Sequence, residues 1–170
     1  MHIERFDLER WQSIHEHDVE INLSESGVQP LRLRELMDGA DAGLEELLAQ
    51  ELGYTQTNGS VSLRERVSAL YAGASAANVL VTNGGSEANF VACWHLIEPG
   101  DEVVVIQPTY MQIPGLARSF GATVRVVWLE DTPGRQDAPH DTTRWRLDID
   151  AVRTAVTPHT RCIALCNPNN

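Results

Sequence analysis

The sequence predicts an α/β protein with a doubly wound, mostly parallel sheet, preceded by an α-helical N-terminal segment. Two observations lead to this fold class. From Asn78 onward, apolar runs of strand length alternate with helical patterns, as in a series of βαβ units. In these runs apolar residues follow one another without alternating with polar ones, which is typical of strands buried on both faces.

The first 77 residues have a different pattern, in which leucines recur at three- and four-residue steps. Such spacing predicts short amphipathic helices. Serines after Gly59 predict the start of a further helix that runs to Tyr71, so residues 54–58 read as a loop between helices. We therefore expect residues 1–77 to form a helical segment, part of a small domain and its connection, and residues 78–170 to form a large α/β domain.

The expected elements of the second part follow in order along the chain. Strands are predicted at Val79–Thr82, Glu102–Ile106, Thr123–Leu129 and Arg161–Cys166, and helices at Ser86–Ile97, Tyr110–Phe120 and Asp148–Val156. The stretch Asp131–Arg144 is rich in Asp, Pro, Thr and Gly and reads as a surface loop.

Composition excludes several classes of function. The chain of 170 residues has 13 basic side chains, all of them arginine, against 24 acidic ones, for a net charge of −11, which argues against a nucleic-acid surface. No apolar run approaches the roughly 20 residues that span a bilayer, and the charged start shows no secretion signal, so we expect a cytoplasmic protein. The odd set Cys93, Cys162 and Cys166 favours reduced thiols in the core over disulfides or a metal site.

The segment Thr82-Asn83-Gly84-Gly85-Ser86 directly follows an expected strand and opens an expected helix. Glycines let the backbone approach a ligand closely, and the start of a helix offers free N–H groups and a positive dipole end that suit a phosphate. The segment has neither the G-x-G-x-x-G of dinucleotide sites nor the Gly-Lys-Ser/Thr of a P-loop. From the turn alone, a phosphate site and a serine-capped turn are equally supported.

Five short motifs, in this order and with these gaps, extend the interpretation. They are Tyr54-Thr55-Gln56-Thr57-Asn58-Gly59 with Leu63-Arg64-Glu65, Gly84-Gly85-Ser86-Glu87-Ala88, Pro99-Gly100-Asp101-Glu102-Val103, Pro108-Thr109-Tyr110 and Asn167-Pro168-Asn169-Asn170. From about Asn22 to its last residue the chain resembles the class I/II aminotransferases, which are fold-type I enzymes that use pyridoxal phosphate (PLP).

The resemblance implies cofactor-binding roles for six residues. Gly84, Gly85 and Ser86 match the turn that holds the cofactor phosphate, and Tyr110 matches the aromatic residue that stacks on the pyridine ring. Asn170 matches the asparagine that hydrogen-bonds the phenolic oxygen. Tyr54 matches a tyrosine that reaches the phosphate of the neighbouring subunit, which implies a homodimer.

The resemblance also implies a substrate site near the N-terminus. Ser26 and Gly27 lie where the family has a glycine-containing segment that closes over the substrate carboxylate. The sequence Ser26-Gly27-Val28 is similar to capreomycidine-synthase-like members, which act on an arginine derivative. The implied substrates are an amino acid and a 2-oxo acid.

The chain contains no lysine, whereas PLP chemistry needs a lysine to bind the cofactor aldehyde and move the α-proton. We therefore expect no catalytic residue here and no activity of the chain alone, and we interpret it as the N-terminal portion of an aminotransferase. Three alternatives stay open: another fold-type I PLP reaction such as cyclisation, elimination or decarboxylation; a non-catalytic binding module; and an unrelated nucleotide-binding α/β domain.

Overall fold

The computed structural model describes residues 3–24, 27–38, 43–131 and 145–169. It separates into two compact units, one of Met1–Glu20 with Asn83–Asn170 and one of Ile21–Thr82. We call the first the sheet unit and the second the helical unit. The predicted division into a small-domain part and a cofactor-binding domain at residue 77 stays a prediction.

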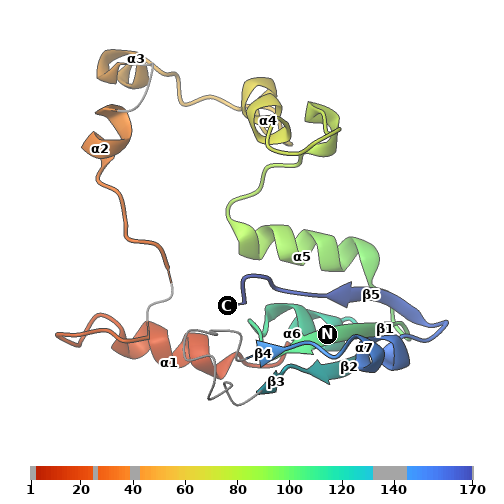
Figure 1. Cartoon of the computed structure of the whole chain (residues 1–170). Helices are drawn as coiled ribbons and strands as arrows, with labels where there is room; N and C mark the ends of the chain where they lie inside the picture. Colours follow the sequence, from red (N-terminus) through yellow and green to blue (C-terminus); the bar gives the residue numbers. More distant parts are fainter. Residues whose placement is uncertain (1–2, 25–26, 39–42, 132–144, 170) are drawn as a thin grey trace, which may run out of the picture. The chain divides into compact units, whose positions relative to one another are not determined.

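The sheet unit is built on three parallel strands in the order β2-β1-β5. Strand β1 (Glu102–Gln107) lies between β2 (Thr123–Trp128) and β5 (Thr160–Ala164), as Figure 1 shows. The side chains of Val103, Val104 and Val105 are wholly buried, which is the reason for the continuous apolar run in the sequence. The predicted parallel sheet is confirmed.

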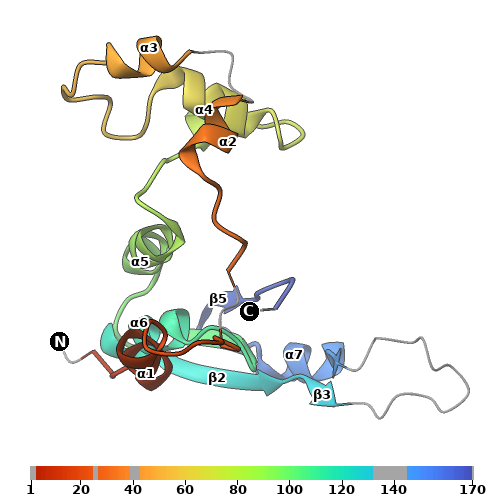
Figure 2. The same cartoon turned by 90° about the vertical axis from the view of Figure 1, so that its left-hand side faces the viewer.

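Helices cover both faces of this sheet (Figure 1 and Figure 2). On one face, α5 (Gly85–Leu96) and α6 (Gln112–Ser119) pack against Val103 and Val105. On the other, α7 (Ile149–Ala155) packs against Val104 and Ile106. Because alternate residues of β1 point to opposite faces, each helix layer has its own apolar core, and the doubly wound arrangement is confirmed.

Two short strands, β3 (Glu130–Asp131) and β4 (Trp145–Arg146), form an antiparallel pair beside this sheet. They flank the predicted loop, of which residues 132–144 lie outside the described residues. The Asp148 carboxylate accepts a hydrogen bond from the Asp150 amide at 2.9 Å and caps α7.

The predicted strand Val79–Thr82 is wrong. These residues follow a 3₁₀ turn, η1 (Ala76–Asn78), and belong to no strand of the described sheets. The amide of Val81 donates to the carbonyl of Asn58 at 3.1 Å, so the apolar run is held by a loop of the helical unit and not by a sheet neighbour. A short apolar run does not itself reveal which partner its backbone finds.

The helical unit contains α2 (Leu33–Asp38), α3 (Leu44–Leu48) and α4 (Val61–Ser68). The Ser60 hydroxyl caps α4 by accepting from the Leu63 amide at 3.4 Å, as the serine pattern predicts. On α4, Arg64 donates to the carbonyls of Gly59 at 3.0 Å and Ala76 at 2.7 Å. This guanidinium therefore ties the start of α4 to η1.

Helix α1 (Asp7–His15) belongs to the sheet unit although it lies at the start of the chain. Glu4, just before it, pairs with Arg118 of α6 at 2.9 Å. The ring of Phe6 meets the ring of Tyr110 edge to face, with 5.1 Å between centroids. These contacts hold α1 beside the carboxyl end of β1.

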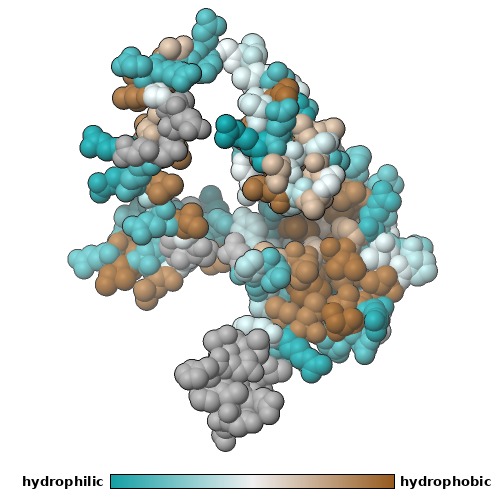
Figure 3. Space-filling view, turned by 45° about the horizontal axis from the view of Figure 1, so that its top comes forward, coloured by the Kyte–Doolittle hydropathy of each residue, from teal (hydrophilic) through white to brown (hydrophobic). Residues whose placement is uncertain are grey.

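The sheet unit has a broad apolar surface (Figure 3). Strand β5 pairs with β1 alone among the described strands. Ile163 of β5 and Leu165 just after it are 50% and 61% exposed. Among the described residues, no helix is both long enough and apolar enough to cross a lipid bilayer.

Candidate functional site

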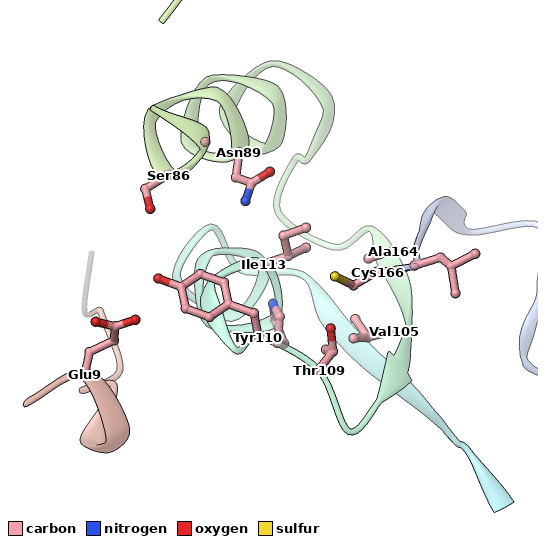
Figure 4. Close-up of a pocket in the computed structure, with 12 residues that line it drawn as sticks. Glu9, Ser86, Asn89, Val105, Thr109, Tyr110, Ile113, Ala164 and Cys166 are labelled. Atoms are coloured by element: carbon pink, nitrogen blue, oxygen red, sulfur yellow. The ribbon is translucent and has the colours of Figure 1, made fainter. Parts of the chain in front are cut away.

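A cavity of about 500 Å³ lies in the sheet unit where β1 and β5 end (Figure 4). The carboxyl edge is where open α/β sheets bind their ligands, and the volume falls within the range of about 300–1,000 Å³ typical of small-molecule sites. Its lining comes from α1, α5, β1, the loop into α6, α6 and the end of β5: Glu9, Gly85, Ser86, Asn89, Val105, Thr109, Tyr110, Ile113, Pro114, Ala164, Leu165 and Cys166.

The first turn of α5 forms one wall of this cavity. Gly84, just before the helix, has φ +91° and ψ 168°, a backbone conformation essentially restricted to glycine. Gly85 is the first helical residue, and a Cβ built there meets no atom of the described chain within 4 Å beyond its chain neighbours and the backbone of its own helix. Since the first amide N–H groups of a helix have no partner within it, this turn can receive an anion.

Tyr110 follows β1 and places its ring across the cavity from α5. Figure 4 shows Ser86 and Glu9 pointing toward its hydroxyl. Partial burial raises the pKa of the Tyr110 hydroxyl above its ordinary value, the nearby Glu9 carboxylate adds to the rise, and the nearby Ser86 hydroxyl opposes it. Tyr110 is therefore a neutral group that can donate to one neighbour and accept from another.

Glu9 is a site residue that the sequence interpretation missed. It is the one charged side chain among the cavity-lining residues of the described chain, and it arrives on a helix about a hundred residues away from Tyr110 in sequence. An acidic residue on an amphipathic helix reads as solvent-exposed, so no sequence signal marks it. The described lining contains no arginine or lysine, so the positive end of α5 is the part of it that suits an anion.

The end of β5 closes the cavity on the opposite side. Cys166 lines it, and the Asn169 side chain donates to the carbonyl of Pro108 at 2.8 Å, which holds the loop after β5 against the loop before α6. All three cysteines are free thiols. Burial raises the pKa of Cys93 and of Cys162, so both are predominantly protonated at neutral pH.

The structure brings some of the predicted site residues together. Gly85, Ser86 and Tyr110 line one cavity. Gly84 comes immediately before Gly85, at the N-terminal end of α5. Tyr54 and Gly27 belong to the helical unit and are exposed. Ser26 and Asn170 lie outside the described residues.

Residues 21–170 match the family model described as aminotransferase class I and II. A histidinol-phosphate aminotransferase of Rubrobacter xylanophilus is 36% identical over 133 residues, which cover 77% of this chain and 33% of that protein. The chain thus spans about a third of the length of this curated relative.

Two solved structures match over 100% of the chain. A PLP-dependent aminotransferase from Streptococcus suis superposes with a TM-score of 0.86 at 30% identity, over 44% of its own length. The PLP-dependent cyclase OrfR superposes with a TM-score of 0.79 at 26% identity, over 42% of its length.

Proposed function

The chain belongs to the class I and II aminotransferases, and on that premise we propose that it is the N-terminal part of an enzyme that moves an amino group between an amino acid and a 2-oxo acid. The single observation that carries the proposal is the cavity that gathers Gly85, Ser86 and Tyr110 at the carboxyl edge of the sheet. The chain spans less than half of the length of these relatives, which supports the proposal that it is part of a longer enzyme.

The residues present fit pyridoxal phosphate. The first N–H groups of α5 have no acceptor within the helix itself, and Gly85 leaves open space where a side chain would stand. Gly84, Gly85 and Ser86 would hold the phosphate, and Tyr110 would pack on the pyridine ring, where an electron-rich aromatic face suits an electron-poor one.

The cofactor, when bound, supplies the electron sink that lets an amino group leave one carbon and join another. The chain's own residues bind and orient it. The Ser86 hydroxyl lies at the helix start, where it can donate to a phosphate oxygen. The edge-to-face contact with Phe6, with 5.1 Å between ring centroids, holds the ring of Tyr110 at the cavity wall. Helix α1 contributes Glu9 to that side of the cavity.

The remaining roles are part of the same proposal. We place Tyr54 at the phosphate of a partner subunit, which requires a homodimer, and its full exposure within the helical unit supports an intermolecular role. Asn170 is assigned to the phenolic oxygen of the cofactor. Ser26 and Gly27 are assigned to the substrate carboxylate.

The absence of lysine leads us to propose that the 170-residue chain alone binds PLP without catalysing transfer. The experiment titrates the chain with PLP and treats the mixture with borohydride. We expect saturable binding, no cofactor fixed by reduction at any group other than the terminal amine, and no 2-oxo acid released from amino acids. A cofactor fixed elsewhere in the chain, located by peptide mass spectrometry, or the lack of saturable binding, contradicts the proposal.

Cyclisation is the second candidate reaction, because a PLP-dependent cyclase is similar to this chain over all of it. Product analysis with the enzyme that contains this chain separates the two candidates. Amino transfer consumes a 2-oxo acid in step with the amino donor, whereas cyclisation proceeds without one.

A further inference from the structure

We propose that Gln112 is a positioning residue that fixes the phosphate-binding turn of α5 relative to Tyr110. The proposal rests on the proposed cofactor but concerns a side chain outside the set implied by the family resemblance. Gln112 is the first residue of α6 and follows Tyr110 by two positions, so it sits on the element that brings the aromatic ring to the cavity.

Both ends of the Gln112 amide bind α5. Its nitrogen Nε2 donates to the backbone carbonyl of Ser86 at 2.8 Å. Its oxygen Oε1 accepts from Nδ2 of Asn89 at 3.0 Å. One side chain thus bridges α6 to two residues one turn apart on α5, and one of them belongs to the phosphate-binding turn.

The Ser86 carbonyl fixes which group donates and which accepts in each of these hydrogen bonds. A backbone carbonyl can only accept, so Gln112 must present its NH₂ group to Ser86 and its oxygen to Asn89. Asn89 must then present its own NH₂ group to Gln112. Asn89 lines the cavity, as Figure 4 shows, so this orientation leaves its oxygen Oδ1 as the end of the amide that a ligand donor can reach.

The core does not hold the first turn of α5 in place. Apolar burial anchors the far end of the helix, where Cys93 and the following Ile97 are buried in the core. Gly85, Ser86 and Glu87 are exposed. The turn proposed to receive the phosphate therefore depends on polar contacts for its position, and the Gln112 bridge reaches its backbone at the Ser86 carbonyl.

The two parts of the proposed cofactor site come from different elements. The phosphate turn belongs to α5, and the aromatic ring follows β1. A cofactor that contacts both needs them at a fixed separation, because small errors of placement weaken every contact at once. Gln112 bonds the phosphate turn at the Ser86 carbonyl and lies two residues after Tyr110 in the chain, so it links the two.

The test compares the affinity of the isolated protein for PLP and for pyridoxal, which lacks the phosphate. The variants are Gln112→Leu and Gln112→Met, the second keeping the length of the side chain, and the control is Ser119→Ala, which removes a hydroxyl that donates to the Gly115 carbonyl on the same helix. We expect both Gln112 variants to lose roughly three- to tenfold in affinity for PLP, the worth of one hydrogen bond, with a much smaller loss for pyridoxal. Ser119→Ala should change neither.

The ratio of the two affinities separates positioning from general destabilisation, which lowers both affinities together. Equal losses for the two ligands in both Gln112 variants, or no loss in either variant, overturn the role of Gln112. A wild-type protein that binds PLP no more tightly than pyridoxal contradicts the proposed phosphate site itself and is recognised before any variant is made.

Discussion

Replacing each of two adjacent glycines, Gly84 and Gly85, by alanine should affect different properties: stability at the first and PLP binding at the second. Gly84 has φ +91° and ψ 168°, a conformation in which a side chain is strained by about 1–3 kcal/mol. Gly85 is the first residue of α5, has no positive φ, and leaves open space where an added Cβ would lie. Gly84→Ala should therefore lower the free energy of unfolding by about 1–3 kcal/mol, whereas Gly85→Ala should change it by less than about 1 kcal/mol in either direction.

For cofactor binding, we expect the substitution at Gly85 to matter although it barely changes stability. A methyl group at Gly85 occupies the space that a phosphate needs next to the helix start, and displacing a charged group from one hydrogen bond costs about 1.5–3 kcal/mol. Gly85→Ala should thus bind PLP roughly 10- to 150-fold more weakly while folding normally.

The assay combines urea unfolding with a PLP titration for each variant. The informative result is a stable Gly85→Ala protein with weak PLP binding beside a destabilised Gly84→Ala protein. If Gly85→Ala binds PLP as the wild type does, the close approach of the phosphate to this turn is refuted. If Gly84→Ala is as stable as the wild type, the reasoning from backbone strain fails.

Three further outcomes follow from other parts of the sheet unit. Hydrogen bonds from Arg125, and next one from Thr157, hold the pKa of Glu102 at about 2. Because this pKa lies below that of the unfolded chain, the ionised Glu102 stabilises the fold fully above about pH 4.5, and this stabilisation is lost as the pH falls toward 2. Glu102→Gln should flatten the dependence of the unfolding free energy on pH over that range, and an unchanged slope contradicts the ion pair. Cys166 lines the cavity, so PLP should slow its reaction with a thiol reagent, whereas Cys93 should react slowly with or without PLP because burial raises its pKa; equal Cys166 rates with and without PLP place the cofactor elsewhere. Tyr110→Phe should keep most of the affinity for PLP and Tyr110→Leu should lose roughly two- to twelvefold, the worth of an aromatic contact, and equal titration curves for the two variants argue against stacking.

Much of the sheet unit could be predicted because buried strands impose a recognisable composition. Val103, Val104 and Val105 are wholly buried and had to be apolar on both faces, so the run marks β1 within one residue of its observed end. The apolar run from Val79 to Thr82 has similar composition but no sheet neighbour. Its amide at Val81 binds a loop carbonyl, and composition does not encode that choice of partner.

The candidate site was predicted only where its chemistry is local. The glycines and serine that begin α5 are a continuous stretch whose backbone requirements appear in the residue types. Glu9 and Gln112 carry no such mark, because their importance comes from tertiary contacts to Tyr110, Ser86 and Asn89. A glutamate or glutamine on a helix has the same local pattern whether it faces solvent or another helix.

The most direct test of the central claim is the amide resonances of the first turn of α5, followed by NMR during a titration of the chain with PLP. The account predicts that the N–H signals of Gly85 and Ser86 shift progressively and saturably, because these groups donate to the phosphate, and that pyridoxal without phosphate shifts them much less. Saturable PLP binding that leaves both signals unmoved contradicts the claim that this turn holds the phosphate.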